Sequence, residues 1–139
     1  MPQATEASET ASRAHDAGVF RRVATQLALA GDLPHAEMAA LLSARLDETD
    51  PRAWANLGAI RARAKDHPGA VEAYLEVLKR SPTDIEAWTN IGELYIVLLD
   101  FEKAAAALRQ AMQLDPQAKH PAGRRARIVV AFTVKRMKK

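Results

Sequence analysis

The chain has 139 residues, of which 48% are hydrophobic and 27% charged, and this balance argues against a disordered or low-complexity chain. It contains no cysteine, which excludes disulfide scaffolds, thiolate metal sites and cysteine nucleophiles and fits a reducing cytoplasm, where we expect the protein to reside. Residues 119–139 hold eight of the 20 Lys and Arg residues and no Asp or Glu, so a basic end follows a mildly acidic body.

The N-terminal segment, residues 1–16, is rich in Ala, Ser, Thr and Glu and has no periodic apolar face. We interpret it as a mobile tail, because such a composition buries little apolar surface. It lacks the basic start and apolar stretch of a secretory signal. No run in the chain approaches the roughly 18 apolar residues of a membrane span, so the sequence predicts no membrane segment.

The middle of the chain repeats itself at an offset of 34 residues. The matching positions are Trp54 and Trp88, Leu57 and Ile91, Gly58 and Gly92, Ala70 and Ala104, and Pro82 and Pro116. A degenerate copy precedes them, with Phe20 in the tryptophan position and Ala36 in the alanine position. The sequence therefore predicts three units, residues 17–50, 51–84 and 85–118.

This pattern resembles the tetratricopeptide repeat (TPR), whose signature is a Trp, a Leu-Gly pair followed by an aromatic residue, an Ala and a Pro at a period of about 34 residues. Arg61 departs from the signature, because an aromatic residue is expected there, whereas Tyr95 fits. The resemblance implies an all-α fold, a right-handed α-solenoid of three helix-turn-helix repeats, followed by a capping helix within residues 119–139.

Local signals support helix pairs independently of the family. Asp32, Asp50 and Asp66 are placed to cap helices, and Thr83 with Glu86 has the spacing of a capping box. Prolines stand next to each of these three aspartates or two residues after them, in first turns where a missing N–H costs little.

Two glycines, Gly58 and Gly92, fall in the middle of predicted helices at a cost of about 1 kcal/mol each relative to Ala. We expect them to permit close approach of the paired helix, near Ala70 and Ala104.

The basic C-terminal segment predicts one helix from about Arg124, whose centre, residues 128–132, is apolar around the full turn. A helix that is apolar all round is usually buried on more than one side. One interpretation is a cap that also contacts the N-terminal part of the body, and the other is an interface with a partner or with a second copy in a homodimer.

No catalytic constellation stands out: the chain has no phosphate-binding glycine loop, no nucleophile elbow and no zinc-protease motif. The four histidines lie in the predicted tail or at turns, and packing explains His67 better than metal ligation does. We therefore expect a protein that is not an enzyme, with no cofactor, no metal and no small-molecule substrate.

By resemblance to TPR proteins, the first helix of each pair lines a concave groove that binds a partner segment. The groove positions are Arg21, Thr25, Leu29, Arg52, Ala55, Asn56, Ala59, Arg63, Glu86, Thr89, Asn90, Glu93 and Val97. Neighbouring positions, among them Ala28, Ala62 and Ile96, extend a small apolar floor that suits a protein or peptide segment with apolar anchors. Asn56 and Asn90 either bond the backbone of that segment or are simply common at these positions.

The carboxylate clamp by which some TPR domains hold acidic chaperone tails is not matched. Glu86 and Asn90 stand where that clamp needs Lys and Arg, and Glu93 adds a second acid. A negatively charged peptide terminus would meet like charge there, so this resemblance disfavours a heat-shock-chaperone adaptor.

Size, repeat number and an apolar groove resemble the class II chaperones of bacterial type III secretion, which cradle a segment of a hydrophobic translocator before export. The main alternative is a general TPR scaffold or assembly factor. A third class, binding to nucleic acid or an anionic surface through the basic end, is disfavoured, because Phe132 is the one aromatic residue there and basic tails also pair with acidic bodies.

Overall fold

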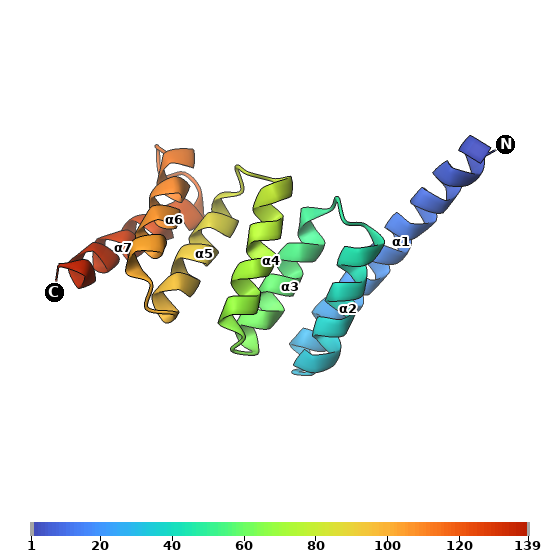
Figure 1. Ribbon diagram of the computed structural model, residues 1–139, viewed down its shortest axis with the longest axis horizontal. Coiled ribbons are helices and arrows are strands. Elements are labelled where there is room, and N and C mark those ends of the chain that lie inside the picture. The colour runs from blue at the N-terminus through green and yellow to red at the C-terminus, as the bar shows by residue number, and fades with distance from the viewer. Residues whose placement is uncertain (1, 139) are drawn as a thin grey trace.

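A computed structural model describes residues 2–138, with side chains from residue 5 onward. These residues form seven helices and no strand. The helices are α1 (Pro2–Leu29), α2 (Leu33–Leu46), α3 (Pro51–Arg63), α4 (His67–Arg80), α5 (Ile85–Val97), α6 (Phe101–Leu114) and α7 (Pro121–Met137). They stand side by side in one row, so the two termini lie at opposite ends of the molecule (Figure 1). The all-α solenoid of paired helices is therefore confirmed.

Aspartate residues begin five consecutive helices, α2 to α6. The carboxylates of Asp32, Asp50 and Asp66 accept backbone N–H bonds from the first helical turn, as the sequence predicts. The predicted capping box at Thr83 is wrong, because Asp84 is the cap of α5 and accepts from the Ala87 N–H at 2.9 Å. An aspartate one residue closer to the helix has the stronger acceptor.

Each turn between the two helices of a pair contains one residue in the left-handed region: Gly31, Lys65 and Leu99, which are spaced by the repeat period. In each turn the next backbone N–H reaches back to a carbonyl five residues earlier, for example from Asp66 to Arg61 at 2.9 Å. This contact satisfies a carbonyl at the helix end. Glycine occupies only the first of these positions, so the other two carry some backbone strain.

The two mid-helix glycines do lie against the paired helix. A Cβ atom on Gly58 would lie 2.8 Å from a ring carbon of Tyr74, and one on Gly92 would lie 2.6 Å from Leu108. The side chains that these glycines admit are thus Tyr74 and Leu108, one turn beyond the predicted alanines. Both are buried, so the missing Cβ atoms allow the helix pairs to close tightly.

The N-terminal segment differs from its prediction, because α1 begins at Pro2 rather than near residue 17. Residues 5–16 are helical and exposed, and Ala17 is the first buried residue among the side chains described. Alanine and glutamate favour helix even without an apolar face, and extension from the packed part of α1 needs no new nucleus. Met1 and Lys139, the outermost residues of the predicted tail and cap, lie outside the described residues.

The C-terminal helix covers the third repeat, packing on α6 and α5. Ala126 of α7 is buried against Leu108 and Ala111 of α6. The interpretation that this cap also meets the N-terminal part of the body is wrong, because α1 and α7 lie at opposite ends of the row (Figure 1). The outer face of α7 is open: Ile128 is 74% exposed and Phe132 is 54% exposed.

Candidate functional site

A groove runs along the face formed by α1, α3 and α5, and three adjoining cavities make it up. The first, of about 260 Å³ between α3 and α5, is lined by Ala55, Asn56, Ala59, Tyr74, Asp84, Glu86, Ala87 and Asn90. The second, of about 210 Å³, is lined by Ala62, Tyr74, Asn90, Glu93, Leu94 and Val97. The third, of about 360 Å³, is lined by Arg21, Arg22, Thr25, Gln26 and Asn56. Shared residues join the three cavities, so we treat them together as the groove.

Most residues that the sequence places in a groove do line these cavities: Arg21, Thr25, Ala55, Asn56, Ala59, Glu86, Asn90, Glu93 and Val97. Small apolar residues, mostly alanines, form the floor, and of these Ala59 and Val97 are exposed. Two predicted floor residues are packed inward instead: Ala28 is buried in a core cluster and Ile96 packs against another. The cavities therefore combine small apolar surface with a polar rim.

Four predicted groove residues lie outside the cavities: Leu29, Arg52, Arg63 and Thr89. Leu29 is 73% exposed at the end of α1, and Arg52 pairs with Asp50. Arg63 donates to the Ala28 carbonyl at 2.9 Å, so it tethers α3 to the end of α1.

Thr89 corrects the sequence prediction most clearly. It is completely buried, and its hydroxyl donates to the Ala122 carbonyl of α7 at 3.1 Å. The docked C-terminal helix covers this position, so Thr89 is a packing residue between α5 and α7 and offers no contact to a partner.

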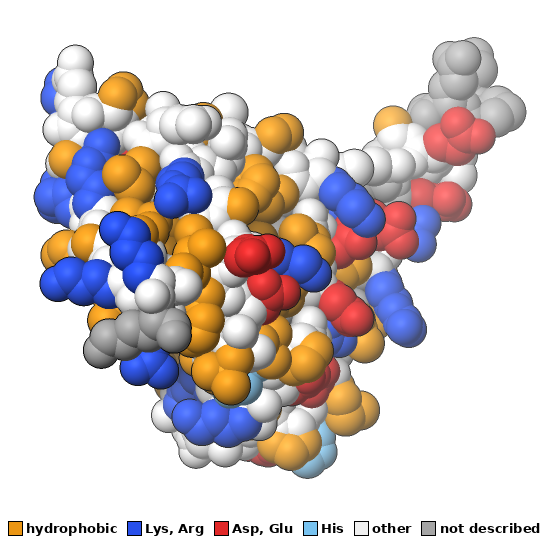
Figure 2. Space-filling view, turned by 60° about the vertical axis from the view of Figure 1, so that its left-hand side comes forward, with side chains coloured by type: hydrophobic (Ala, Val, Ile, Leu, Met, Phe, Trp, Pro, Cys, Tyr) orange, Lys and Arg blue, Asp and Glu red, His pale blue; other side chains and the backbone are white. Residues whose placement is uncertain are grey.

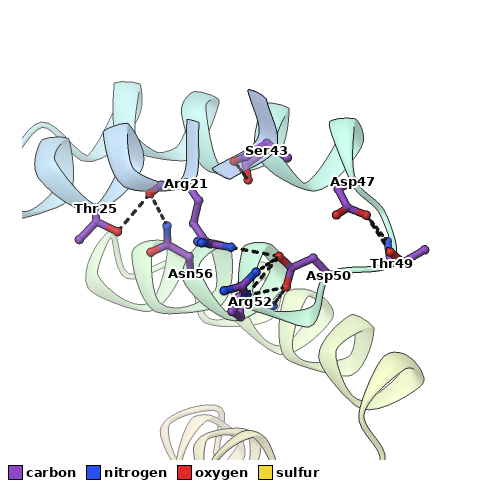
Figure 3. Close-up of polar contacts among 9 residues, drawn as sticks. Arg21, Thr25, Ser43, Asp47, Thr49, Asp50, Arg52 and Asn56 are labelled. Atoms are coloured by element: carbon purple, nitrogen blue, oxygen red, sulfur yellow. Dashed lines mark hydrogen bonds and ion pairs between the residues drawn. The ribbon is translucent and has the colours of Figure 1, made fainter. Parts of the chain in front are cut away.

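An ion network occupies the N-terminal end of the groove (Figure 3). The Asp50 carboxylate accepts from Arg21 of α1 at 3.0 Å and from Arg52 of its own helix at 2.9 Å. Burial alone would raise the pKa of Asp50, but hydrogen bonds from the Arg52 side chain and backbone, with the charges of Arg52 and Arg21, outweigh it and lower that pKa. The charges of Arg21, Asp50 and Arg52 therefore satisfy one another.

The two asparagines of the groove make internal contacts. The Asn56 amide donates to the Arg21 carbonyl at 3.3 Å, which ties α3 to α1 (Figure 3). Asn90 accepts from the Arg125 guanidinium of α7 at 3.1 Å, and the same guanidinium pairs with Glu93. Both asparagines therefore bond groups of this chain, a role that the sequence does not predict.

Tyr74 is a groove residue that the sequence prediction missed. It comes from α4, yet its side chain passes over Gly58 and lines both cavities between α3 and α5. Burial raises the pKa of Tyr74 to about 12, and the charge of Glu86 adds to this effect, while a hydrogen bond with Asn90 opposes it. The periodicity of α4 alone assigns Tyr74 to the core, and the glycine opposite was the available signal.

Charge is divided along the molecule. Figure 2 shows Lys and Arg side chains gathered over the C-terminal end, with Asp and Glu farther toward the N-terminal extension. Several of these C-terminal bases have internal partners: Arg125 contacts Glu93 and Arg127 pairs with Asp115. Within residues 2–138 no helix is long and apolar enough to cross a membrane, and no group of three His, Asp or Glu residues is placed to hold a metal ion.

Comparisons with known proteins agree with this geometry. Family models described as tetratricopeptide repeat match residues 51–94 and 85–118. No curated protein matches the sequence significantly.

Several solved structures share the fold. The first TPR domain of Spaghetti (RPAP3) bound to an HSP90 peptide is 14% identical, with a TM-score of 0.81 over 91% of this chain and 96% of that one. The Yersinia enterocolitica type III secretion chaperone SycD, in complex with a peptide of the translocator YopD, is 18% identical, with a TM-score of 0.74 over 87% and 91% of the two chains. PcrH in complex with the chaperone-binding region of PopD is 20% identical, with a TM-score of 0.80 over 86% and 92%.

Proposed function

The chain belongs to the tetratricopeptide-repeat family, and we propose that it is a non-catalytic interaction module that binds a segment of a partner protein in its groove. The observation that carries this proposal is the continuous groove itself. Its three cavities follow one another along α1, α3 and α5, and its alanine floor leaves room for side chains that enter from outside. An extended or helical segment with small apolar anchors fits such a surface.

The finer proposal is a chaperone that holds an apolar segment of a type III secretion translocator. Two proteins with the same fold were solved with partner segments bound: SycD with a peptide of the translocator YopD, and PcrH with the chaperone-binding region of PopD. The floor here suits that task, because Ala59 and Val97 present apolar surface among polar rim residues. Such a floor shields short apolar side chains of a partner from water. This role implies that the chain is a cytoplasmic protein of a bacterium.

A general scaffold that joins two proteins is the second candidate function. One observation favours it: the exposed Ile128 and Phe132 of α7 form a second apolar surface outside the groove. A protein with two separate apolar surfaces is suited to contact two partners, and the outer face of α7 also suits a second copy of this chain in a homodimer.

Capture of partners by purified wild-type protein, compared with the Ala59→Glu and Val97→Glu variants, tests the proposal. We expect both variants to weaken capture roughly tenfold or more, because the longer charged side chain fills space on the floor that the partner segment enters and must give up its water when the segment binds. Ala106→Glu, at an exposed position of α6 outside the groove, is the matched control. Captured proteins are identified by mass spectrometry and re-measured as purified components.

The outcomes separate the candidates. One dominant partner with long apolar segments, kept soluble by wild type and lost with Val97→Glu, supports the chaperone. Several soluble partners that survive without this protein support the scaffold. Full affinity in both groove variants would move the binding site elsewhere and overturn the proposed function.

A further inference from the structure

The carboxylates along the groove differ in their partners, and one of them has no hydrogen-bond or ion-pair partner among the described residues. At the N-terminal end the Asp50 carboxylate is satisfied by two arginines. At the opposite end the carboxylate of Glu93 is satisfied by Arg125. Between them lies Glu86, which is exposed and makes no hydrogen bond or ion pair with any described residue.

The cavity beside Glu86 is built for one side chain. Its volume of about 260 Å³ lies below the roughly 300–1,000 Å³ of pockets for drug-sized ligands. Ala55, Ala59 and Ala87 supply apolar walls, while Asp84, Glu86 and the amide of Asn90 supply acceptors. A long side chain with an apolar stem and a cationic head matches this lining.

An arginine of this chain already binds the acidic rim of the groove. The guanidinium of Arg125 reaches from α7 to the Glu93 carboxylate and to the Asn90 oxygen, the latter at 3.1 Å. Asn90 also lines the cavity of Glu86, so the two acidic positions are neighbours along one rim. Tyr74 lines both cavities, together with Asp84 and Glu86 in the first and with Glu93 in the second.

We infer that the partner segment inserts a Lys or Arg side chain into the cavity between α3 and α5, where its cationic head pairs with Glu86 and Asp84. The inference rests on the proposed function, because it specifies the segment that occupies the groove. Apolar side chains before or after this residue lie on the alanine floor and beside Val97. A segment with Asp or Glu at this point is rejected, because like charges meet there.

The other end of the groove adds polarity to the segment. Arg22 lines the cavity between α1 and α3, is exposed and has no acidic partner among the described residues. The bound segment therefore carries its basic residue near α5 and tolerates an acidic residue near α1. This charge order fixes the direction in which the segment runs along the groove.

Selection from a random displayed peptide library tests the inference directly. Wild type should enrich peptides with a Lys or Arg at a fixed spacing from apolar residues. Glu86→Lys should lose that preference or select Asp or Glu at the same place. Glu102→Lys is a matched control, because Glu102 is also an exposed acid in the first turn of a helix but lies on α6 outside the groove.

A quantitative arm uses the best enriched peptide and its Lys→Gln or Arg→Gln version. We expect the neutral peptide to bind wild type about tenfold more weakly, a difference of about 1.4 kcal/mol, because its side chain no longer carries the charge that pairs with Glu86. The same change should matter little against Glu86→Gln, and the two losses should not add.

The outcomes separate this inference from the proposed function. Peptides that bind through apolar anchors, are lost with Val97→Glu and are indifferent to Glu86→Lys overturn the basic anchor and leave groove binding in place. Peptides unaffected by Ala59→Glu and Val97→Glu, or no enrichment at all, overturn groove binding and the inference together.

Discussion

The second and third repeats, residues 51–84 and 85–118, have the same framework but different groove chemistry. Asp50 and Asp84 cap the first helix of each repeat, and Gly58 and Gly92 sit at equal depth in those helices. Their charges differ, however: Arg52, which lies outside the groove and pairs with Asp50, corresponds by the repeat period to Glu86, which lines the groove and is unpaired among the described residues.

The difference teaches where this architecture is free to change. Positions that cap a helix or admit a side chain from the paired helix are set by geometry, since a Cβ on either glycine would clash. Positions on the groove face carry no such constraint, so neighbouring repeats can hold opposite charges. Even the paired positions Tyr74 and Leu108 diverge, because the side chain of Tyr74 lines the cavities between α3 and α5, whereas Leu108 packs under α7.

The largest expected effect concerns how each repeat is closed. The second repeat is closed by α5 of the next repeat, whereas the third is closed only by α7. Removal of residues 119–139 should uncover Leu108, Ala111 and Thr89 and lower the free energy of unfolding by more than about 3 kcal/mol, with aggregation. Urea unfolding and light scattering measure both effects.

Removal of residues 1–16 is the control at the other end. Residues 5–16 are exposed, so this deletion should leave the unfolding midpoint nearly unchanged. A soluble protein ending at residue 118 with wild-type stability would show that the third repeat needs no cover.

The next effect separates Tyr74 from its counterpart Leu108. Because the folded pKa of Tyr74 is about 12, above the value near 10 of an unfolded tyrosine, the neutral phenol is favoured by folding. Its contribution is constant below about pH 10 and is lost as the pH rises from about 10 to 12, by about 2–3 kcal/mol in all. Unfolding measured from pH 9 to 12, for wild type and Tyr74→Phe, tests this.

The stability of wild type should fall relative to Tyr74→Phe across that interval. Parallel curves for the two proteins would mean that Tyr74 ionises as an exposed tyrosine does, and would remove its hydroxyl from the interior between α3 and α5.

Much of the framework was readable from the sequence, because caps, glycines and the 34-residue period are local signals. The sequence predicts the caps Asp32, Asp50 and Asp66. It also predicts most of the residues that line the groove. Predictions from local sequence were wrong where a helix distant in the sequence determines whether a residue is buried. Thr89 has the spacing of a groove residue, and only the docked α7 buries it.

The same limit explains the other misses. Arg125 belongs to a basic helix in the sequence, yet it satisfies two acceptors on the groove face of α5. The N-terminal part of α1 was missed for a different reason: it has no apolar face, so periodicity is silent, while helix propensity and continuity with a packed helix suffice.

The smallest effect distinguishes the two equivalent caps. Asn caps a helix about as well as Asp, so Asp→Asn isolates the charge from the capping bond. Asp50→Asn should lower the free energy of unfolding by about 1 kcal/mol at pH 7, because it removes the pairs with Arg21 and Arg52. Asp84→Asn should cost less than about 0.5 kcal/mol, since no described arginine pairs with Asp84.

The acid limb of the pH profile sharpens this contrast. The pKa of Asp50 is lowered in the folded protein, so its contribution is fully present above the unfolded value near 4 and is lost as the pH falls below it, through the folded value. The difference between wild type and Asp50→Asn should therefore shrink as the pH drops from about 5 to 2. Equal costs for the two substitutions at pH 7 would mean that the arginines around Asp50 add nothing to its cap. The charges that distinguish the second repeat from the third would then make no difference to the free energy of unfolding.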